Sequence, residues 1–480
     1  MPTTNAVAVN MQEMPVNPGS SILSQLPVGL NGRTIQDEGI NKLPNELLLM
    51  IWYYLSSSTA SRGGKKGMVA TKPEATFTYT FELSWVSPRW RSLAVNTPKL
   101  WSYVSLSMST SGPLLGLQLE RTKNCPLHVT VDIQPERDSF RVTFKLTKRM
   151  TLRVLGLLQQ LISTSERWET LDLEFKSEVD EGMEDEPLTL GKQLQDVDLP
   201  KLKELSVVRG GKFPWVVDDT LRMLRNGAPH INELTMGTIR MDRHTHLLRG
   251  LTALTLDQVR SPVDAPAFRR LLSECPSLMK LIIVGPCISF TGDNKEDQPL
   301  YFRSLQLLDV NFCRDDKEFC SRFFSLLNAP NVNLLRLTEC DAAPLNAMTA
   351  ALRRNAAFTS QLKKVILRHG ERRVLDWSHL DVAKAPGNIS TVGLAAATFC
   401  AAFPSIKELQ LSLHTLDLHA KWHGRSVPIT LGNDLRTLVK VRNTEDFPLK
   451  SIHMDRGVFS QLDSKSQAWL REHGNLELVR

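Results

Sequence analysis

A hydrophobic unit with fixed internal spacing recurs along most of the chain. In each copy an apolar residue is followed three and five positions later by two more, as in Leu278, Leu281 and Ile283. Because residues two apart in a strand face the same side, the last two positions predict a short strand with one buried face. The ten units begin at Trp168, Leu202, Ile231, Leu251, Leu278, Leu305, Val332, Leu362, Ile406 and Leu449.

The spacing of these units predicts a repeat of one strand and one helix. Successive units begin 34, 29, 20, 27, 27, 27, 30, 44 and 43 residues apart, and several follow a helical run with a proline, as at 268–276. The pattern resembles a leucine-rich repeat of irregular type. We therefore expect an α/β fold, an irregular solenoid of short parallel strands and helices, with loop insertions around 371–400 and 415–445.

Two cysteines fit the same resemblance. Cys313 and Cys340 each lie eight residues after the first apolar residue of their unit, and they are 27 residues apart. Leucine-rich repeats place asparagine or cysteine at this position, where the side chain satisfies backbone groups of the turn. The resemblance therefore implies structural rather than reactive thiols.

A helical period precedes the units. Leu43, Leu47, Ile51 and Leu55 recur every four residues, which predicts an amphipathic helix with Pro44 in its first turn. The following Ser-, Gly- and Lys-rich segment predicts a flexible insertion.

Two further helical segments follow that insertion. An apolar segment occupies 77–86, and Ser87 and Pro88 are suited to cap and open another helix. This helix is expected to end near the Thr-Pro-Lys-Leu-Trp sequence of 97–101.

The combined motif resembles an F-box, most closely the fungal variety. It contains Leu-Pro-x-Glu-Leu-Leu-x-x-Ile-x-x-x-Leu at 43–55, Val-Ser-x-x-Trp-Arg-x-Leu-Ala at 86–94 and Pro-x-Leu-Trp at 98–101. The insertion departs from the family pattern, as do Ser87 and Pro88, where the family commonly has Cys and a basic residue.

The resemblance implies a small all-α module that docks on a Skp-family adaptor and through it on a cullin. The expected domains are a disordered tail at 1–38, an F-box at 39–106 with its insertion at 56–75, and a leucine-rich-repeat-like substrate-binding domain at 107–480. The residues expected to contact the adaptor are Leu43, Pro44, Leu47, Ile51, Val86 and Trp90.

Residues between the buried positions of each predicted strand face away from the core, and stacked repeats bring them together. The mixture of charged and apolar side chains there suits protein binding, with ordinary solvent-facing positions as the alternative. The candidate substrate-binding residues are Lys280, Asp309, Arg336, Lys364, Arg368 and Glu408, accompanied by Ile282, Leu307, Leu334, Gln410 and His453.

Composition narrows the class of protein. Leucine accounts for 72 of 480 residues, an excess that the two periodic patterns explain. The net charge is +7, of which +5 falls in 40–106 (eight Lys and Arg against three Glu), without the basic stripe and interleaved aromatics expected of a nucleic-acid partner.

The longest apolar stretch, 47–54, is too short for a membrane span, and we expect no signal peptide at 1–39. Seven cysteines without a C-x-x-C pair favour reduced thiols and a cytoplasmic or nuclear location.

The sequence contains few candidates for a catalytic, phosphate-binding or metal-binding site. The segment 62–67 has phosphate-loop composition but not its spacing, and His414, His419 and His423 lack further ligands at convincing spacing. The acidic run 178–186 is interpreted as a solvated loop that can also engage a basic partner. We expect no catalytic residue, cofactor or metal ion.

These observations predict the non-catalytic substrate receptor of an SCF-type ubiquitin ligase, which holds its substrate near the ubiquitin-charged enzyme. One alternative is a repeat scaffold that is not engaged in ubiquitination. The other is a standalone enzyme that uses the histidine-rich C-terminal region.

Overall fold

The computed structural model describes most of the chain from residue 42 onward. The described residues are 42–60, 74–107, 109–133, 148–176, 193–194, 197–210, 228–237, 248–257, 263–285, 287–290, 298–311, 317–338, 342–353, 358, 361–369, 399, 403, 405–406, 408–413, 433, 435–440, 451–460 and 462–479. The predicted tail, Cys313, Cys340 and most of the two predicted loop insertions lie outside these residues. The chain divides into two compact units, Met1–Ile51 and Trp52–Arg480.

Helices and parallel strands follow one another along the chain. The helices are α2 (Asn45–Ala60), α3 (Glu74–Val86), α4 (Pro88–Val95), η3 (Pro98–Trp101), α5 (Gly112–Thr122), α6 (Lys148–Ile162), η4 (Ser165–Arg167), α9 (Ala265–Ser273), α10 (Lys317–Leu326), α11 (Ala342–Leu352), α15 (Arg456–Ser460) and α16 (Ser464–His473). The strands are β1 (Tyr103–Ser107), β2 (Leu127–Ile133), β3 (Trp168–Lys176), β4 (Glu204–Gly210), β5 (Glu233–Gly237), β6 (Ala253–Asp257), β7 (Val263–Asp264), β8 (Lys280–Val284), β9 (Ile288–Ser289), β10 (Leu300–Tyr301), β11 (Leu307–Asn311), β12 (Leu327–Asn328), β13 (Leu334–Thr338), β14 (Lys364–His369), β15 (Glu408–Leu413), β16 (Ser451–Asp455) and β17 (Leu476–Val479).

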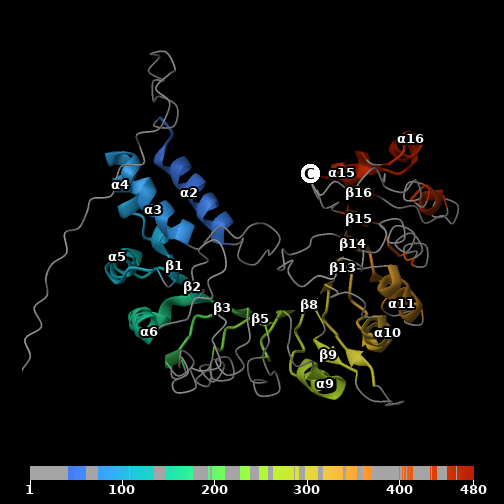
Figure 1. The fold of residues 1–480 in the computed structure, drawn as a ribbon, viewed down its shortest axis with the longest axis horizontal. Coiled ribbons are helices and arrows are strands. Elements are labelled where there is room, and N and C mark those ends of the chain that lie inside the picture. Colours follow the sequence, from blue (N-terminus) through green and yellow to red (C-terminus); the bar gives the residue numbers. More distant parts are fainter. Residues whose placement is uncertain are drawn as a thin grey trace, which may run out of the picture. The chain divides into compact units, whose positions relative to one another are not determined.

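Thirteen strands form one parallel sheet in the order β1-β2-β3-β4-β5-β6-β8-β11-β13-β14-β15-β16-β17 (Figure 1). Each of the ten sequence units supplies one of these strands, from β3 to β16, so the fold is α/β with a long parallel sheet. Strands β1, β2 and β17 were not predicted. The short strands pair separately, β7 with β9 and β10 with β12.

The leucines of the repeated units build one continuous core. Leu281 and Ile283 are fully buried, and so are their register neighbours Leu308 and Leu335. Apolar side chains of α5, α6, α9, α10 and α11 belong to the same core cluster, and Figure 1 shows these helices along one side of the strands. The core therefore lies between the helices and the leucine side of the sheet.

The N-terminal helices follow the prediction except at Pro44 and at the insertion. Helix α2 begins at Asn45, so Pro44 precedes the first turn, and its carbonyl accepts a hydrogen bond from the Leu48 N–H at 3.1 Å. Helix α2 continues to Ala60 and α3 begins at Glu74, so the two ends of the segment predicted as a flexible insertion, 56–60 and 74–75, are helical. The reason is local: the first glycines of the segment are Gly63 and Gly64, and nothing in 56–60 interrupts a helix.

The predicted cap of α4 is confirmed. The Ser87 side chain accepts a hydrogen bond from the backbone N–H of Trp90 at 3.2 Å, and Pro88 occupies the first helical position.

Buried polar contacts join the helical segments to the first strand. The Trp101 indole N–H donates to the Ala94 carbonyl at 2.8 Å, and Arg121 lies over the Trp101 ring at 4.4 Å. The Gln118 amide donates to the carbonyls of Trp101 and Tyr103 at 3.1 and 2.8 Å. Helix α5 thus holds η3 and β1 together.

Within the described ranges, each helix is too short or too polar to cross a bilayer.

The free energy of unfolding should respond differently to a leucine-to-alanine substitution on the two sides of β13. Leu335 is fully buried, whereas its neighbour Leu334 is half-buried on the opposite side. We expect Leu335→Ala to lower the free energy of unfolding by about 2–5 kcal/mol, and Leu334→Ala to cost less than about half of that. Urea unfolding followed by tryptophan fluorescence measures both, and equal losses would contradict the assignment of the two faces.

Candidate binding surfaces

Helix α2 carries more apolar side chains than its packing uses. Leu48 and Trp52 are buried, at 0% and 1% exposure. Leu47, Met50 and Ile51 remain 45%, 65% and 42% exposed. Of the predicted stripe, Leu47 and Ile51 are therefore not on the packed side of the helix, Leu43 precedes the helix and is half-buried, and the Leu55 side chain lies outside the described residues. Large apolar side chains of α2 are thus left facing solvent.

The C-terminal end of α3 also exposes large apolar side chains. Trp85 is 72% exposed and Val86 is 57% exposed. Val86 was among the residues predicted to contact the adaptor, but Trp85 and Met50 were not. Met50 belongs to the continuous apolar run 47–54, whereas Trp85 ends the alternating apolar and polar sequence of 77–85, whose period of two does not show which side of a helix packs.

Trp90 has a different environment from the other predicted adaptor residues. It is only 6% exposed, and its ring packs against Trp52 with a centroid distance of 5.0 Å. Its indole N–H is buried, and the described residues supply no acceptor for it. Trp90 thus supports the position of its neighbours, whereas Pro44 is exposed and Leu43 is half-buried.

The side of the sheet opposite the leucines forms a second surface, here called the open face. It consists of three ladders of side chains, of which the first runs Tyr103, His128, Thr170, Glu204, Glu233, Ala253, Lys280, Leu307, Leu334, Lys364, Glu408 and Ser451. The second and third ladders lie two and four residues further along each strand. Parallel sheets usually have helices on both faces. In the described part of the chain, α5, α6, α9, α10 and α11 pack on the leucine side, so the opposite face is a candidate for binding a partner.

The structure places all six predicted substrate-binding residues on the open face. Lys280, Lys364 and Glu408 lie on the first ladder, Asp309 and Arg336 on the second, and Arg368 on the third. Four of them form cross-strand ion pairs, Arg336 with Asp309 at 3.0 Å and Lys364 with Glu408 at 3.1 Å. Asp309 is also 8% exposed. Their binding role stays a prediction, and these ion pairs offset much of their charge.

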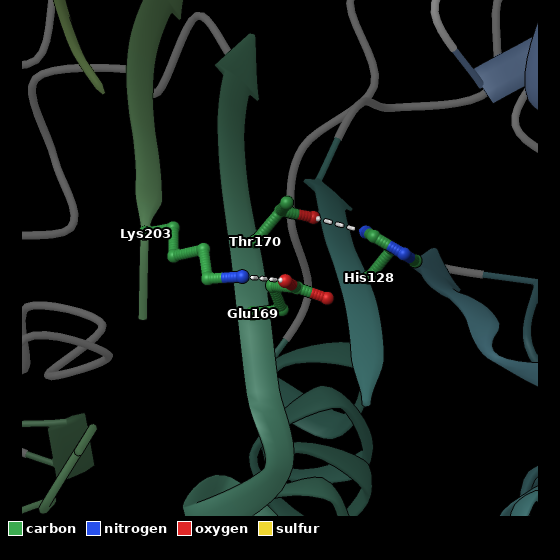
Figure 2. A network of polar contacts seen from close by, with 4 residues as sticks. All are labelled: His128, Glu169, Thr170 and Lys203. Carbon is green, nitrogen blue, oxygen red and sulfur yellow. Dashed lines mark hydrogen bonds and ion pairs between the residues drawn. The ribbon is translucent and has the colours of Figure 1, made fainter. Parts of the chain in front are cut away.

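A polar network stands at the start of β2, β3 and β4 (Figure 2). His128 Nδ1 lies 3.1 Å from the Thr170 hydroxyl, and the His128 ring stacks on Tyr103 at 4.5 Å. Glu169 forms an ion pair with Lys203, which lowers the pKa of the Glu169 carboxyl. Burial lowers the pKa of His128, and the nearby Glu169 only partly opposes that shift.

Carboxylates gather next to this network. Glu204 and Glu233 are direct register neighbours on β4 and β5. The pKa of Glu204 is raised, first by burial and then by repulsion from Glu233 and Glu169, and the attraction of Lys280 and Lys203 is a smaller effect. Like charges therefore face one another on this part of the open face.

The described residues contain no group of three or more His, Cys, Asp or Glu side chains placed to hold a metal ion. The predicted histidine alternative, His414, His419 and His423, lies outside them, as do the phosphate-loop-like segment 62–67 and the acidic run 178–186. Burial raises the pKa of the Cys275 thiol to about 12, so this cysteine is not a nucleophile at neutral pH.

The lowered pKa of His128 predicts a loss of stability in acid. Below its ordinary pKa of 6.5 the unfolded chain binds a proton that the folded chain binds only at lower pH. We expect the free energy of unfolding to fall more steeply from about pH 7 to about pH 5 in the unaltered protein than in His128→Gln. Urea titrations at a series of pH values measure the slopes, and parallel slopes would contradict the effect of burial on His128.

Comparisons with known proteins assign no role to the exposed side chains of α2 or to the open face. No model of a known protein family matches this chain, and no curated protein matches it.

Proposed function

We propose that this chain is the substrate-recognition subunit of an SCF-type ubiquitin ligase, with its N-terminal helices docking on a Skp-family adaptor. The observation that carries the proposal is the exposure of Leu47, Met50 and Ile51 on a helix whose Leu48 and Trp52 are already buried. Large apolar side chains held in water by a rigid helix favour insertion into a partner's groove.

The local motif agrees with this role. Leu43 and Pro44, directly before α2, and the buried Trp90 are among the residues on which the F-box resemblance depends. Helix α2 is continuous from Asn45 to Ala60, so Leu47 and Ile51 lie on one regular helix.

In this proposal the parallel sheet is the leucine-rich-repeat part, and its open face holds the protein substrate. The chain contributes no chemistry of its own. It brings the substrate close to the ubiquitin-charged enzyme, and the gain in rate comes from proximity. A repeat scaffold that does not engage an adaptor would retain the open face without using the exposed side chains of α2.

The proposal is tested by introducing charge into the exposed side of α2. We expect Leu47→Glu with Ile51→Glu to weaken binding of the full chain to a purified Skp-family adaptor by at least about 100-fold, because both side chains would enter a desolvated groove. Isothermal titration calorimetry or pull-down with the purified adaptor measures the loss.

A matched control uses the same chemical change elsewhere. Leu114 and Leu152 are 40% and 59% exposed on α5 and α6, outside the F-box-like segment. Leu114→Glu with Leu152→Glu should bind the adaptor as the unaltered protein does. Binding retained by the α2 variant, or absent from the unaltered protein, would overturn the assignment.

A further inference from the structure

Charge is distributed unevenly along the open face. At the ladder positions of β2 to β6 there are six carboxylates and neither lysine nor arginine, whereas β8, β11, β13 and β14 carry four basic side chains and one carboxylate. Beyond the third ladder, β3 ends in Lys176. The six carboxylates are Asp132, Asp172, Glu174, Glu204, Glu233 and Asp257.

The register brings like charges directly opposite one another. Glu204 on β4 is the direct register neighbour of Glu233 on β5. Such pairs destabilise a sheet, because neighbouring strands hold their side chains close together. The raised pKa of Glu204 reports this repulsion together with burial. A cation placed over β4 and β5 would relieve it.

The neighbouring strands indicate what kind of cation fits. Next to the acidic strands, the open face presents the half-buried apolar side chains of Ile282, Leu307 and Leu334. A surface that is acidic on one side and apolar on the other suits a polypeptide, and it repels the phosphates of a nucleic acid.

We propose that the open face of β2 to β6 is a docking surface for a cationic protein segment, whose lysine or arginine side chains contact Glu204 and Glu233. The inference rests on the proposed function in one respect. If the chain is the substrate receptor of a ubiquitin ligase, the cationic segment belongs to its protein substrate. It commits to a partner by charge complementarity, which governs encounter rate and partner choice more than total affinity.

The dimensions of the sheet set the length of the segment. Adjacent strands are about 4.8 Å apart, so β2 to β6 span about 19 Å. An extended chain advances about 3.3 Å per residue and therefore crosses them with about six residues, of which about three face the sheet. A sequence with a basic residue at every second position matches this surface best.

The experiment uses the purified full chain and a fluorescein-labelled peptide of alternating lysine and serine, about twelve residues long. We expect the peptide to bind and raise the fluorescence anisotropy at about 0.05 M salt, and to dissociate at about 0.5 M salt. The matching peptide of alternating glutamate and serine should not bind. Absence of lysine-peptide binding, or equal binding of both peptides, would overturn the proposal.

Two charge-neutralising variants locate the surface. Glu204→Gln with Glu233→Gln keeps side-chain size and should weaken lysine-peptide binding about three- to tenfold. The control, Glu120→Gln with Glu166→Gln, removes two exposed carboxylates from α5 and η4 and should leave binding unchanged. Equal affinity of the two variants would place the peptide elsewhere and overturn the inference.

Adaptor binding by the same protein preparations separates the two proposals. Peptide binding that depends on Glu204 and Glu233 without any adaptor binding would overturn the ligase role and leave the cationic docking surface standing. Adaptor binding without peptide binding would overturn the docking surface alone.

Discussion

The stacking of apolar side chains at equivalent register positions is the constraint on which the rest of this structure depends. Leu254, Leu281, Leu308 and Leu335 occupy successive strands at one register position and are all fully buried. Parallel pairing fixes the register, and a shift of one residue would turn every such leucine away from the helices. The excess of leucine is therefore a consequence of repeating one packing solution along the sheet.

This constraint leaves the opposite side of each strand comparatively unrestricted. Positions between the leucines need only tolerate a pleated backbone, so they hold six carboxylates on β2 to β6, and mainly basic or apolar residues with the single carboxylate Asp309 on β8 to β14. Where opposite charges meet in register they form ion pairs, as Arg336 does with Asp309. Stability is thus concentrated on the leucine face of the sheet, and core packing does not determine the residue types of the opposite face.

The ten predicted strands were found because their leading apolar residue lies three positions before the strand core. In β2 a register shift between Leu127 and His128 shortens that spacing to two, and the pattern missed it. In β1 the spacing is regular, from Trp101 to Val104 and Leu106, but Trp101 had been assigned to the helical motif. Strand β17 was missed because it lacks a leading apolar residue. The exposed Trp85 was missed because apolar and polar residues alternate over 77–85, a period of two that does not reveal which side of a helix packs.

The acidic strands also show why a sheet can retain an unfavourable charge arrangement. The Glu204–Glu233 pair costs little, because exposed carboxylates keep much of their hydration and salt screens them. Their combined potential extends beyond single contacts and disfavours any anionic segment on β2 to β6. Discrimination then comes from repulsion of the wrong partner as much as from attraction of the right one. A small loss of stability at Glu204 and Glu233 thereby becomes selectivity, while the leucine side of the sheet maintains the fold.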